Sequence, residues 1–332
     1  MSRSIHREIV ARLPWSTKPR IGRLRQHEPK PLRVPARYLQ ASVPVRAPTI
    51  TIVTPSYQQG GFLDRTIYSV VNQQYPGLEY IVQDGGSSDQ TLEVLRRFDH
   101  VLTRWASEAD SGQADAINRG FRETSGDVMA WLNSDDLLLP GSLAYVARFF
   151  VEHPEVDVVY GHRLMIDEND EQIGAWVLPR HDDLVLTLAD YVPQETLFWR
   201  RRIWESVGSS VDTSFAYALD WDLLLRFHEA KAKMVRLPRF IGAFRIHDEQ
   251  KTTVTHAIGE AECDLLRRRV HGRSVPNGEV FERLRPYLLR HMLAHARYRV
   301  VDRLTIRRCY VRTSPSQLWS TRPAAGPSLL EQ

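Results

Sequence analysis

The residues with the clearest chemical potential form one short run, Asn-Ser-Asp-Asp at positions 133–136. The mostly apolar residues 128–132 come directly before it, which is typical of a buried strand in a parallel sheet. Such a strand places Asp135 and Asp136 at the carboxyl edge of the sheet, where open α/β sheets bind ligands. Two adjacent carboxylates repel each other, and a divalent cation such as Mg²⁺ or Mn²⁺ relieves that repulsion. In the alternative interpretation, the run is a solvated loop and Asp136 only begins the next helix.

Three earlier predicted strands, at residues 49–54, 79–83 and 101–106, also lead into polar residues. The polar residues that follow them are Ser56 with Tyr57, Asp84, and Ser107 with Glu108. Helical apolar patterns and short loops separate the strands, which predicts a parallel sheet with right-handed crossovers. Because the carboxyl ends of parallel strands meet at one edge, we expect the four polar strand ends to converge in one crevice.

The second half of the chain continues the alternation of helices and strands. The expected elements are a helix up to residue 153, strands at 156–160 and 172–177, a short helix at 182–190, a strand within 193–201, a helix at 220–227 and strands at 234–237 and 241–246. Asp220 and Asp222 fall in the first turn of the 220–227 helix, where the helix dipole favours acids. His247 follows the last strand and completes the set of candidate residues at strand and helix ends.

The pattern of charges, prolines and apolar residues divides the chain into four parts. These are a basic, proline-rich N-terminal arm at 1–47, an α/β domain at 48–256, a basic amphipathic helical appendix at 257–312 and a tail at 313–332. The tail shows no periodicity, which predicts disorder. The expected fold class is therefore α/β, with a mostly parallel sheet flanked by helices and with helices appended at its end.

Composition excludes several classes of protein. The chain has 332 residues, of which 42% are apolar, with a net charge of +4. Two cysteines, Cys263 and Cys309, and the absence of a zinc-binding pattern favour a reduced, cytoplasmic protein. No signal-peptide pattern is visible, and no run approaches the roughly 18 apolar residues of a spanning helix. We therefore expect a protein that is not integral to a membrane.

The basic residues gather at the two ends of the chain, and the pI is near 9.1. In the appendix, arginines alternate with leucines and aromatic residues at helical spacing. One interpretation is contact with an anionic membrane surface, with shallow insertion of Leu288, Met292 and Leu293. The other is a solvated helical face that packs on the α/β domain. No motif that reads nucleic acid is present, so a nucleic-acid partner is not expected.

Six segments in order resemble those of family 2 glycosyltransferases, which have the GT-A fold. The segments are TPSYQQ (54–59), QDGGSSDQT (83–91), SEADSGQADAINRG (107–120), GDVMAWLNSDD (126–136), LDWDL (219–223) and FRIH (244–247). The resemblance covers roughly residues 48–255 and implies a Rossmann-like, mostly parallel sheet. It also implies an inverting, metal-dependent transfer of a sugar from a nucleoside diphosphate to a hydroxyl group.

The resemblance assigns the nucleotide-sugar donor to one group of residues. They are Thr54, Pro55, Tyr57, Asp84, Asp110, Asn133 and Ser134. Asp84 matches the acid that reads the nucleotide base, although Gly85 stands where many relatives carry a second acid. Asn133 replaces the first acid of an Asp-x-Asp motif, and its amide can bond a ribose hydroxyl. Tyr57 either lines the base pocket or only packs.

The resemblance assigns the chemistry to three further residues. Asp135 and His247 are the expected ligands of Mg²⁺ or Mn²⁺, and a protonated His247 would suit the diphosphate itself. Asp220 is the expected general base for the acceptor hydroxyl. Asp222 is the alternative base, although a capping or structural role is the stronger expectation for it.

The expected function is the assembly of a surface polysaccharide or glycolipid in the cytoplasm or at the inner face of the membrane. The donor would be a UDP-, dTDP- or GDP-sugar, and the acceptor a glycan or a lipid-linked glycan. One alternative is a catalytically weak or inactive protein that only binds nucleotide sugars, supported by the amide at Asn133. A nucleotidyltransferase is another alternative. It is disfavoured because Pro-Ser-Tyr-Gln follows the first strand where a glycine-rich basic loop is expected.

Overall fold

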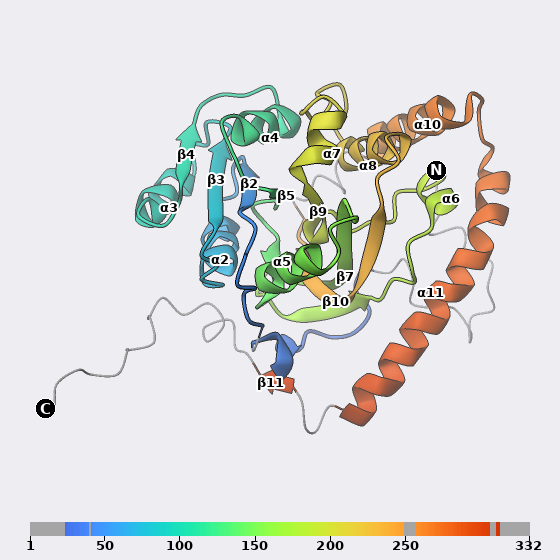
Figure 1. Cartoon of the computed structure of the whole chain (residues 1–332), viewed down its shortest axis with the longest axis horizontal. Coiled ribbons are helices and arrows are strands. Elements are labelled where there is room, and N and C mark those ends of the chain that lie inside the picture. The colour runs from blue at the N-terminus through green and yellow to red at the C-terminus, as the bar shows by residue number, and fades with distance from the viewer. Residues whose placement is uncertain (1–23, 40, 249–255, 306–309, 313–332) are drawn as a thin grey trace, which may run out of the picture.

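The structure is a computed structural model that describes residues 24–39, 41–248, 256–305 and 310–312 (Figure 1). Within these residues, a nine-stranded mixed sheet has the order β4-β3-β2-β5-β9-β7-β10-β6, with β8 paired to β7. The strands are β2 (Ile50–Ser56), β3 (Leu78–Asp84), β4 (Arg104–Ser107), β5 (Val128–Trp131), β6 (Leu137–Leu138), β7 (Val158–Ile166), β8 (Gln172–Trp176), β9 (Phe198–Arg200) and β10 (Met234–Arg245). Most of the paired residues belong to parallel pairings, so the expected α/β class is confirmed.

The first four strands form the parallel half of the sheet. Three helices connect them in the alternating order that the sequence predicts: α2 (Gly60–Val71), α3 (Thr91–Phe98) and α4 (Gln113–Phe121). The strand expected from residue 101 begins only at Arg104. The backbone N–H groups of Val101 and Leu102 instead donate to the carbonyl of Phe98 and close the end of α3.

Two apolar layers cover the sheet because successive strand side chains point to opposite faces. On one face, Ile52 and Val82 pack with α2, α3 and α5 (Ser142–Glu152). On the other face, Val53 and Trp131 pack with α4, α6 (Asp183–Leu186), α7 (Arg201–Ser206) and α8 (Leu219–Glu229). The carboxyl edge between these layers is left to the polar strand ends.

The second half of the sheet has one strand whose direction the sequence left open and one strand that differs from the prediction. The strand β9 runs antiparallel to both of its neighbours, β5 and β7. The two strands expected at 234–237 and 241–246 form one continuous strand, β10, whose register with β7 shifts between Arg236 and Gly242. Pro238 lies within this irregularity, since a proline has no N–H for the ladder.

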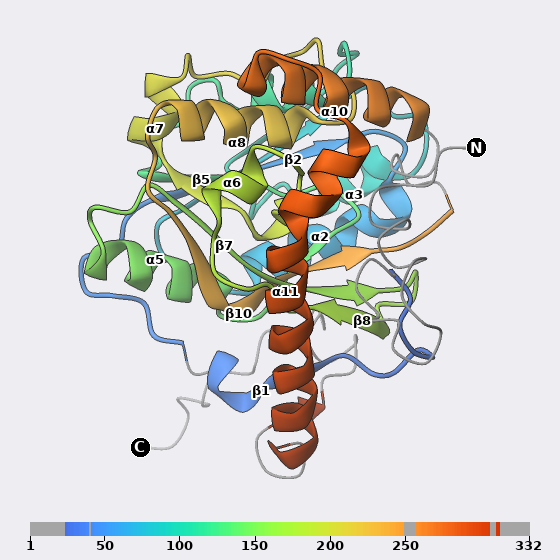
Figure 2. The ribbon, with the colours of Figure 1, turned by 90° about the vertical axis from the view of Figure 1, so that its right-hand side faces the viewer.

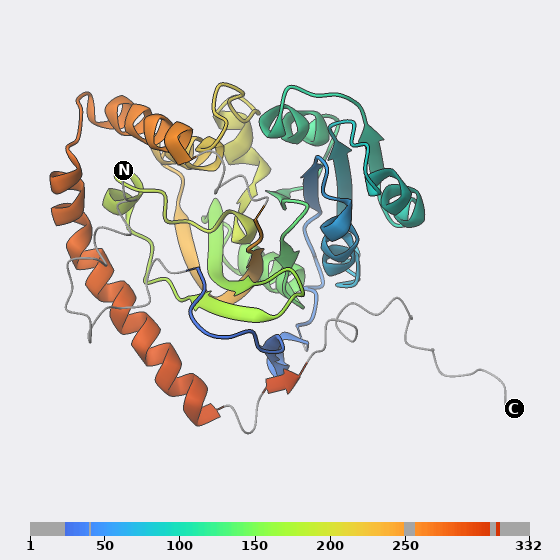
Figure 3. The ribbon, with the colours of Figure 1, turned by 180° about the vertical axis from the view of Figure 1, so that it is seen from behind.

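The segments outside the expected α/β domain pack against it. From the N-terminal side, Leu32, Val34 and Tyr38 are buried, and β1 (Arg33–Pro35) pairs antiparallel with β11 (Tyr310–Arg312). Figure 3 shows this segment running past β8, to which Lys30 bridges at Gln172. The described part of the expected arm therefore contributes to the core. The expected tail at 313–332 lies outside the described residues.

The appendix consists of α10 (His256–His271) and α11 (Asn277–Thr305). Figure 2 shows α11 running along the molecule from the end of α10 towards β1. Leu266, Leu284 and Leu288 belong to the same core cluster as α8, so the expectation that Leu288 inserts into a membrane is wrong. Among the helices of the described residues, none has the length and apolar character needed to cross a bilayer.

Candidate active site

The carboxyl ends of β2, β3 and β4 lie side by side in register. Ser56 pairs with Asp84, and Asp84 pairs with Ser107. Asp84 is fully buried and accepts hydrogen bonds from the backbone N–H groups of Gly86 and Ser87 and from the hydroxyls of Ser87 and Ser107. The carboxylate expected to read a base therefore also fixes the loop after β3, which makes this part of the site rigid.

Asp110 lies directly against Gly85. A Cβ atom at position 85 would come within 2.9 Å of Asp110 Oδ2, so a larger residue would displace this carboxylate. The backbone N–H of Gly112 donates to Asp110 Oδ1 at 2.8 Å and holds it in place. Many relatives carry a second acid directly after the one that matches Asp84, and this chain has Gly85 there. Asp110 thus places a carboxylate against that position.

The residues expected around the base divide into a buried and an exposed set. Thr54 and Pro55 are buried in β2, and the Thr54 hydroxyl shares a 3.0 Å hydrogen bond with the hydroxyl of Tyr80. Tyr57 follows the strand and is 63% exposed. Tyr57 is therefore the member of this group whose ring is accessible to a planar ligand, while Thr54 and Pro55 support the strand beneath it.

The run after β5 is held in place by its neighbours. Asn133 Oδ1 accepts a hydrogen bond from Gln113 Nε2 at 2.8 Å. Ser134 is buried, and the hydroxyl of Thr66 donates to its carbonyl at 2.7 Å and to that of Asp136 at 2.8 Å. The amide of Asn133 is thus oriented by α4, and the backbone before and after Asp135 is anchored by α2.

The two adjacent carboxylates have different environments. Asp136 is buried, and its Oδ1 accepts a 3.0 Å hydrogen bond from the backbone N–H of Arg245. Burial, with the nearby negative charges of Asp135 and Glu195, raises the pKa of Asp136 well above its usual value. The side chain of Asp135 remains 21% exposed. Asp135 is therefore the acid that is accessible to a ligand, whereas Asp136 is buried and bonded to the backbone of Arg245.

His247 Nε2 lies 3.0 Å from Asp135 Oδ2. The guanidinium Nε of Arg245 donates to the carbonyl of Asp135 at 2.7 Å, and the ring of Phe62 packs on His247 at 4.7 Å between centroids. Neighbouring ligands of an octahedral Mg²⁺ or Mn²⁺ are also about 3 Å apart, so this carboxylate and imidazole fit such an ion. No group of three His, Cys, Asp or Glu side chains suited to a metal exists among the described residues. The other ligands would therefore come from diphosphate and water.

The two acids of α8 are also distinct. Asp222 is fully buried and binds Arg226 Nε at 2.9 Å and Arg269 Nη1 at 2.5 Å, which confirms a structural role. Asp220 is half-buried, and its Oδ1 accepts the N–H of Trp221 at 2.9 Å. Asp220 is therefore the acid of this pair that is partly exposed.

Asp190 is a neighbour of Asp220 that no sequence motif marked. Surrounding protein atoms and the charge of Asp220 raise the pKa of Asp190 well above its usual value, and Arg163 opposes the rise. The residue is exposed, so its carboxylate is accessible to water. Two carboxylates thus lie near each other, one on α8 and one after α6.

Comparison with known proteins identifies relatives of this chain. The family model Glycosyl transferase family 2 matches residues 51–204. A PGL/p-HBAD biosynthesis glycosyltransferase of Mycobacterium tuberculosis is 29% identical over 194 residues, which are 57% of this chain and 73% of the relative. A second glycosyltransferase of that species, named as uncharacterized, is 30% identical over 186 residues, or 54% of this chain and 69% of the relative.

Solved structures share the fold at low sequence identity. S. aureus TarS 1-349 in complex with UDP-GlcNAc matches with a TM-score of 0.55 and 17% identity, over 73% of this chain and 72% of that one. A longer TarS chain is covered over only 43% of its length. Mannosyltransferase PcManGT from Pyrobaculum calidifontis, in complex with GDP-Man and Mn²⁺, matches with a TM-score of 0.53 and 17% identity, over 80% of both chains. Both sequence and fold thus lead to one conclusion: the chain belongs to glycosyltransferase family 2 and has the GT-A fold.

Proposed function

We propose that this glycosyltransferase moves a sugar from a nucleoside diphosphate sugar to a hydroxyl of a glycan or lipid-linked acceptor, with inversion at the anomeric carbon. The observation that carries this proposal is the accessible carboxylate of Asp135, held 3.0 Å from His247 at the carboxyl edge that also holds Asp84. The ligands and names of the relatives support the class of donor and product. TarS has been solved in complex with UDP-GlcNAc and PcManGT in complex with GDP-Man, and the mycobacterial relative is named for PGL/p-HBAD biosynthesis.

The donor side of the site would be organised around the leaving diphosphate. Asp135 and His247 would hold a Mg²⁺ or Mn²⁺ ion, and such an ion neutralises charge on a leaving diphosphate. Asn133 and Asp110 offer an amide and a carboxylate for donor hydroxyls, and the exposed ring of Tyr57 offers a stacking surface for the base. UDP-, dTDP- and GDP-sugars all remain donors of the required chemistry.

On the acceptor side, Asp220 would act as general base. The acceptor hydroxyl gives its proton to the Asp220 carboxylate, and its oxygen forms a bond to the anomeric carbon. The bond from that carbon to the diphosphate oxygen breaks, and the diphosphate leaves with the electron pair. Attack on the face opposite the leaving group inverts the configuration. Asp190 would keep a like charge beside Asp220 and so favour proton uptake by the pair.

The decisive experiment is hydrolysis of a panel of UDP-, dTDP- and GDP-sugars without acceptor, with Mg²⁺ or Mn²⁺ and with excess chelator. We expect one donor class to be hydrolysed only when metal is present. Asp135→Ala should remove this activity, while Asp64→Ala, which changes an exposed acid on α2, should not. Full hydrolysis in chelator, or an active Asp135→Ala variant, would contradict the metal role. Donor binding without turnover by the wild type would instead identify a binding protein.

A further inference from the structure

A cavity of about 400 Å³ lies between η1 (Ala36–Tyr38), α5 and the first half of β10. Arg37, Arg148 and Arg239 are among the residues that line it. Arg239 precedes Arg245 by six residues along β10, a separation of roughly 20 Å in an extended strand. The cavity is therefore separate from the site around Asp135 and belongs to none of the roles described above.

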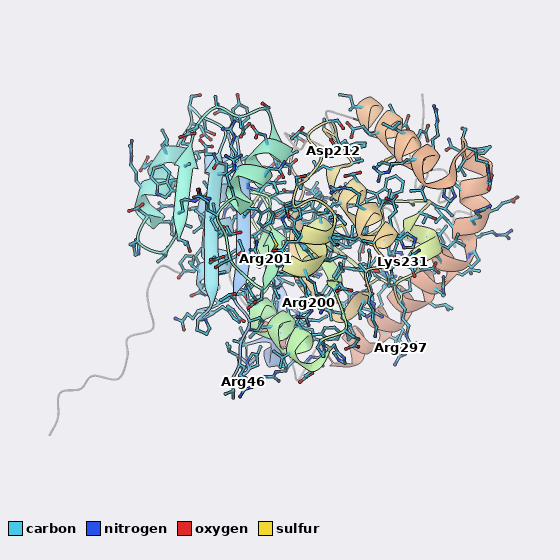
Figure 4. All side chains as sticks on the ribbon, turned by 45° about the horizontal axis from the view of Figure 1, so that its top comes forward. Arg46, Arg200, Arg201, Asp212, Lys231 and Arg297 are labelled. Carbon is cyan, nitrogen blue, oxygen red and sulfur yellow. The ribbon has the colours of Figure 1, made fainter. Side chains whose placement is uncertain are left out.

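The lining of this cavity is strongly one-sided in charge. Among the described residues, the lining contains the three arginines and two tyrosines, Tyr38 and Tyr145, and no acidic residue. Arg37 and Arg148 are exposed, and Arg148 Nη2 donates to the carbonyl of Ser42 at 2.7 Å. Figure 4 shows Arg46 on the same side of the molecule as α5, where it adds a further exposed cation. The cavity thus has the electrostatic character of an anion site.

Arg239 is the most unusual of these residues, because its side chain is buried and forms no ion pair with any of the described residues. Its guanidinium stacks on the rings of Tyr38 and Tyr145, at 3.8 and 4.8 Å from their centroids, and Nη2 donates to the carbonyl of Pro140 at 2.7 Å. Its Nε is buried and has no hydrogen-bond partner in the part of the chain that the structure describes. Burial lowers the pKa of Arg239 to about 10 and Arg37 adds to this, while the two tyrosines oppose it.

The backbone around the cavity is shaped to hold Arg239. Gly141 has a φ of 67°, and a Cβ atom there would collide with the carbonyl of Tyr38 and lie 3.0 Å from Arg239 Nη2. The hydroxyl of Tyr38 in turn accepts the backbone N–H of Phe240 at 3.0 Å. The guanidinium is therefore held in place before any ligand arrives, which reduces the side-chain entropy that binding an anion would cost.

We propose that this cavity binds a phosphate group, carried either by a soluble phosphorylated compound or by a lipid head group. Phosphate presents several charged acceptor oxygens, which matches three guanidinium groups better than a single carboxylate does. The fixed Arg239 would contact the oxygen that enters deepest, and the exposed Arg37 and Arg148 would close on the outer oxygens. The proposal does not depend on the proposed catalytic function, because the cavity shares no residue with that site.

The test measures binding of inorganic phosphate by calorimetry at low salt with chelator present, and retention on phosphatidylglycerol against phosphatidylcholine vesicles. Three proteins are compared: the wild type, an Arg37→Ala/Arg148→Ala double variant, and Arg96→Ala as a control that removes an exposed arginine from α3. Because both exposed arginines can be removed without opening the core, the double variant should keep the melting temperature. Arg239→Gln is measured as a fourth protein and tests the buried arginine.

We expect the double variant to bind the phosphate ligand at least about tenfold more weakly than the wild type, and Arg96→Ala to be unchanged. This pattern with inorganic phosphate supports the proposal and indicates a soluble ligand. The same pattern with phosphatidylglycerol vesicles alone supports it and indicates a lipid head group. If wild type and double variant behave alike in both assays, or if neither ligand binds, the proposal is overturned.

Discussion

Arg269, on α10, donates to the carboxylate of Asp222, on α8, with 2.5 Å between Nη1 and Oδ1. Glu262 of α10 makes a second contact with the start of α8. Its carboxylate accepts hydrogen bonds from three backbone N–H groups of the residues that lead into α8. The three donors are those of Ala216, Tyr217 and Ala218, each at 2.8 Å. The appendix helix therefore caps and anchors the helix turn that carries Asp220.

From this relationship we predict that Glu262 positions Asp220. Glu262→Ala removes the acceptor of three N–H groups, so the first turn of α8 should shift, and kcat for transfer should fall by about a hundredfold with little change in donor KM. Glu282→Ala, an exposed acid on α11, is the control. Steady-state kinetics and thermal unfolding are measured together. A variant that only unfolds at lower temperature, with kcat intact, would assign Glu262 to stability alone.

The second prediction separates the two acids of α8. Asp220→Asn should lower kcat by about 10²–10⁴-fold while donor binding survives, because the amide keeps the shape but loses the basicity. Asp222→Asn should mainly lower the free energy of unfolding. The loss is about 2–3 kcal/mol, less than for a fully buried pair because Arg226 and Arg269 reach water. Calorimetry with the donor and unfolding in urea check both statements. If the Asp220→Asn enzyme is active, Asp220 is not the general base.

The third prediction concerns the pH dependence that Asp190 imposes. Its raised pKa means that the pair Asp190 and Asp220 takes up a proton at higher pH than an isolated acid would. Asp190→Asn removes the like charge, so the remaining carboxylate should lose its proton more readily and the acid limb of kcat/KM should move to lower pH. A pH profile of both enzymes gives the answer. Asp183→Asn, an exposed acid on α6, should leave the limb in place.

The fourth prediction concerns the membrane contact that the basic appendix suggests. The arginines of α10 and α11 are partly engaged within the protein, since Arg267 donates to the carbonyl of Leu188 and Arg290 pairs with Asp182. On α11, however, Leu289 and Leu293 are 57% and 68% exposed, one helical turn apart. We propose that this face meets an anionic bilayer.

A variant with Leu289→Ser and Leu293→Ser tests this contact without disturbing the packed side of α11. We expect the wild type to sediment with anionic vesicles at low salt, and the variant to sediment less. A protein truncated before α10 is unsuitable because Leu266 and Leu284 belong to the core. Equal sedimentation of wild type and variant would assign this helix face to solvent.

The parallel half of the sheet could be predicted because each strand and its polar end lie within one short stretch of the sequence. The β-branched run of β2 and the apolar run of β5 each end in polar residues, and parallel topology brings such ends together. The difference between Asp135 and Asp136 could not be predicted, since it depends on Arg245 and Glu195, which lie far along the chain. Periodicity marked α10 as amphipathic but could not name Asp222 as the partner of Arg269. The exposed Asp190 lies in no motif, so only the fold brings it to Asp220.

The last prediction follows from His162, which is buried on β7. Its Nδ1 accepts the backbone N–H of Leu178 at 3.1 Å, and its ring lies 5.4 Å from that of Phe240. Burial, with the positive charge of Arg236, lowers the pKa of His162 from 6.5 to about 3. In the unfolded chain, His162 therefore becomes protonated below about pH 6.5, whereas in the folded protein it stays neutral down to about pH 3.

Stability must consequently fall as the pH is lowered through this window, by up to about 1.4 kcal/mol per pH unit from His162. His162→Asn keeps an acceptor for Leu178 but cannot titrate. The variant should be less stable at neutral pH, because it loses ring contacts, yet its free energy of unfolding should decline less steeply between pH 6.5 and pH 4.5. Urea unfolding across that range measures both slopes. His100→Asn, at an exposed position, should keep the slope of the wild type, and identical slopes for wild type and His162→Asn would show that His162 is protonated in the folded protein.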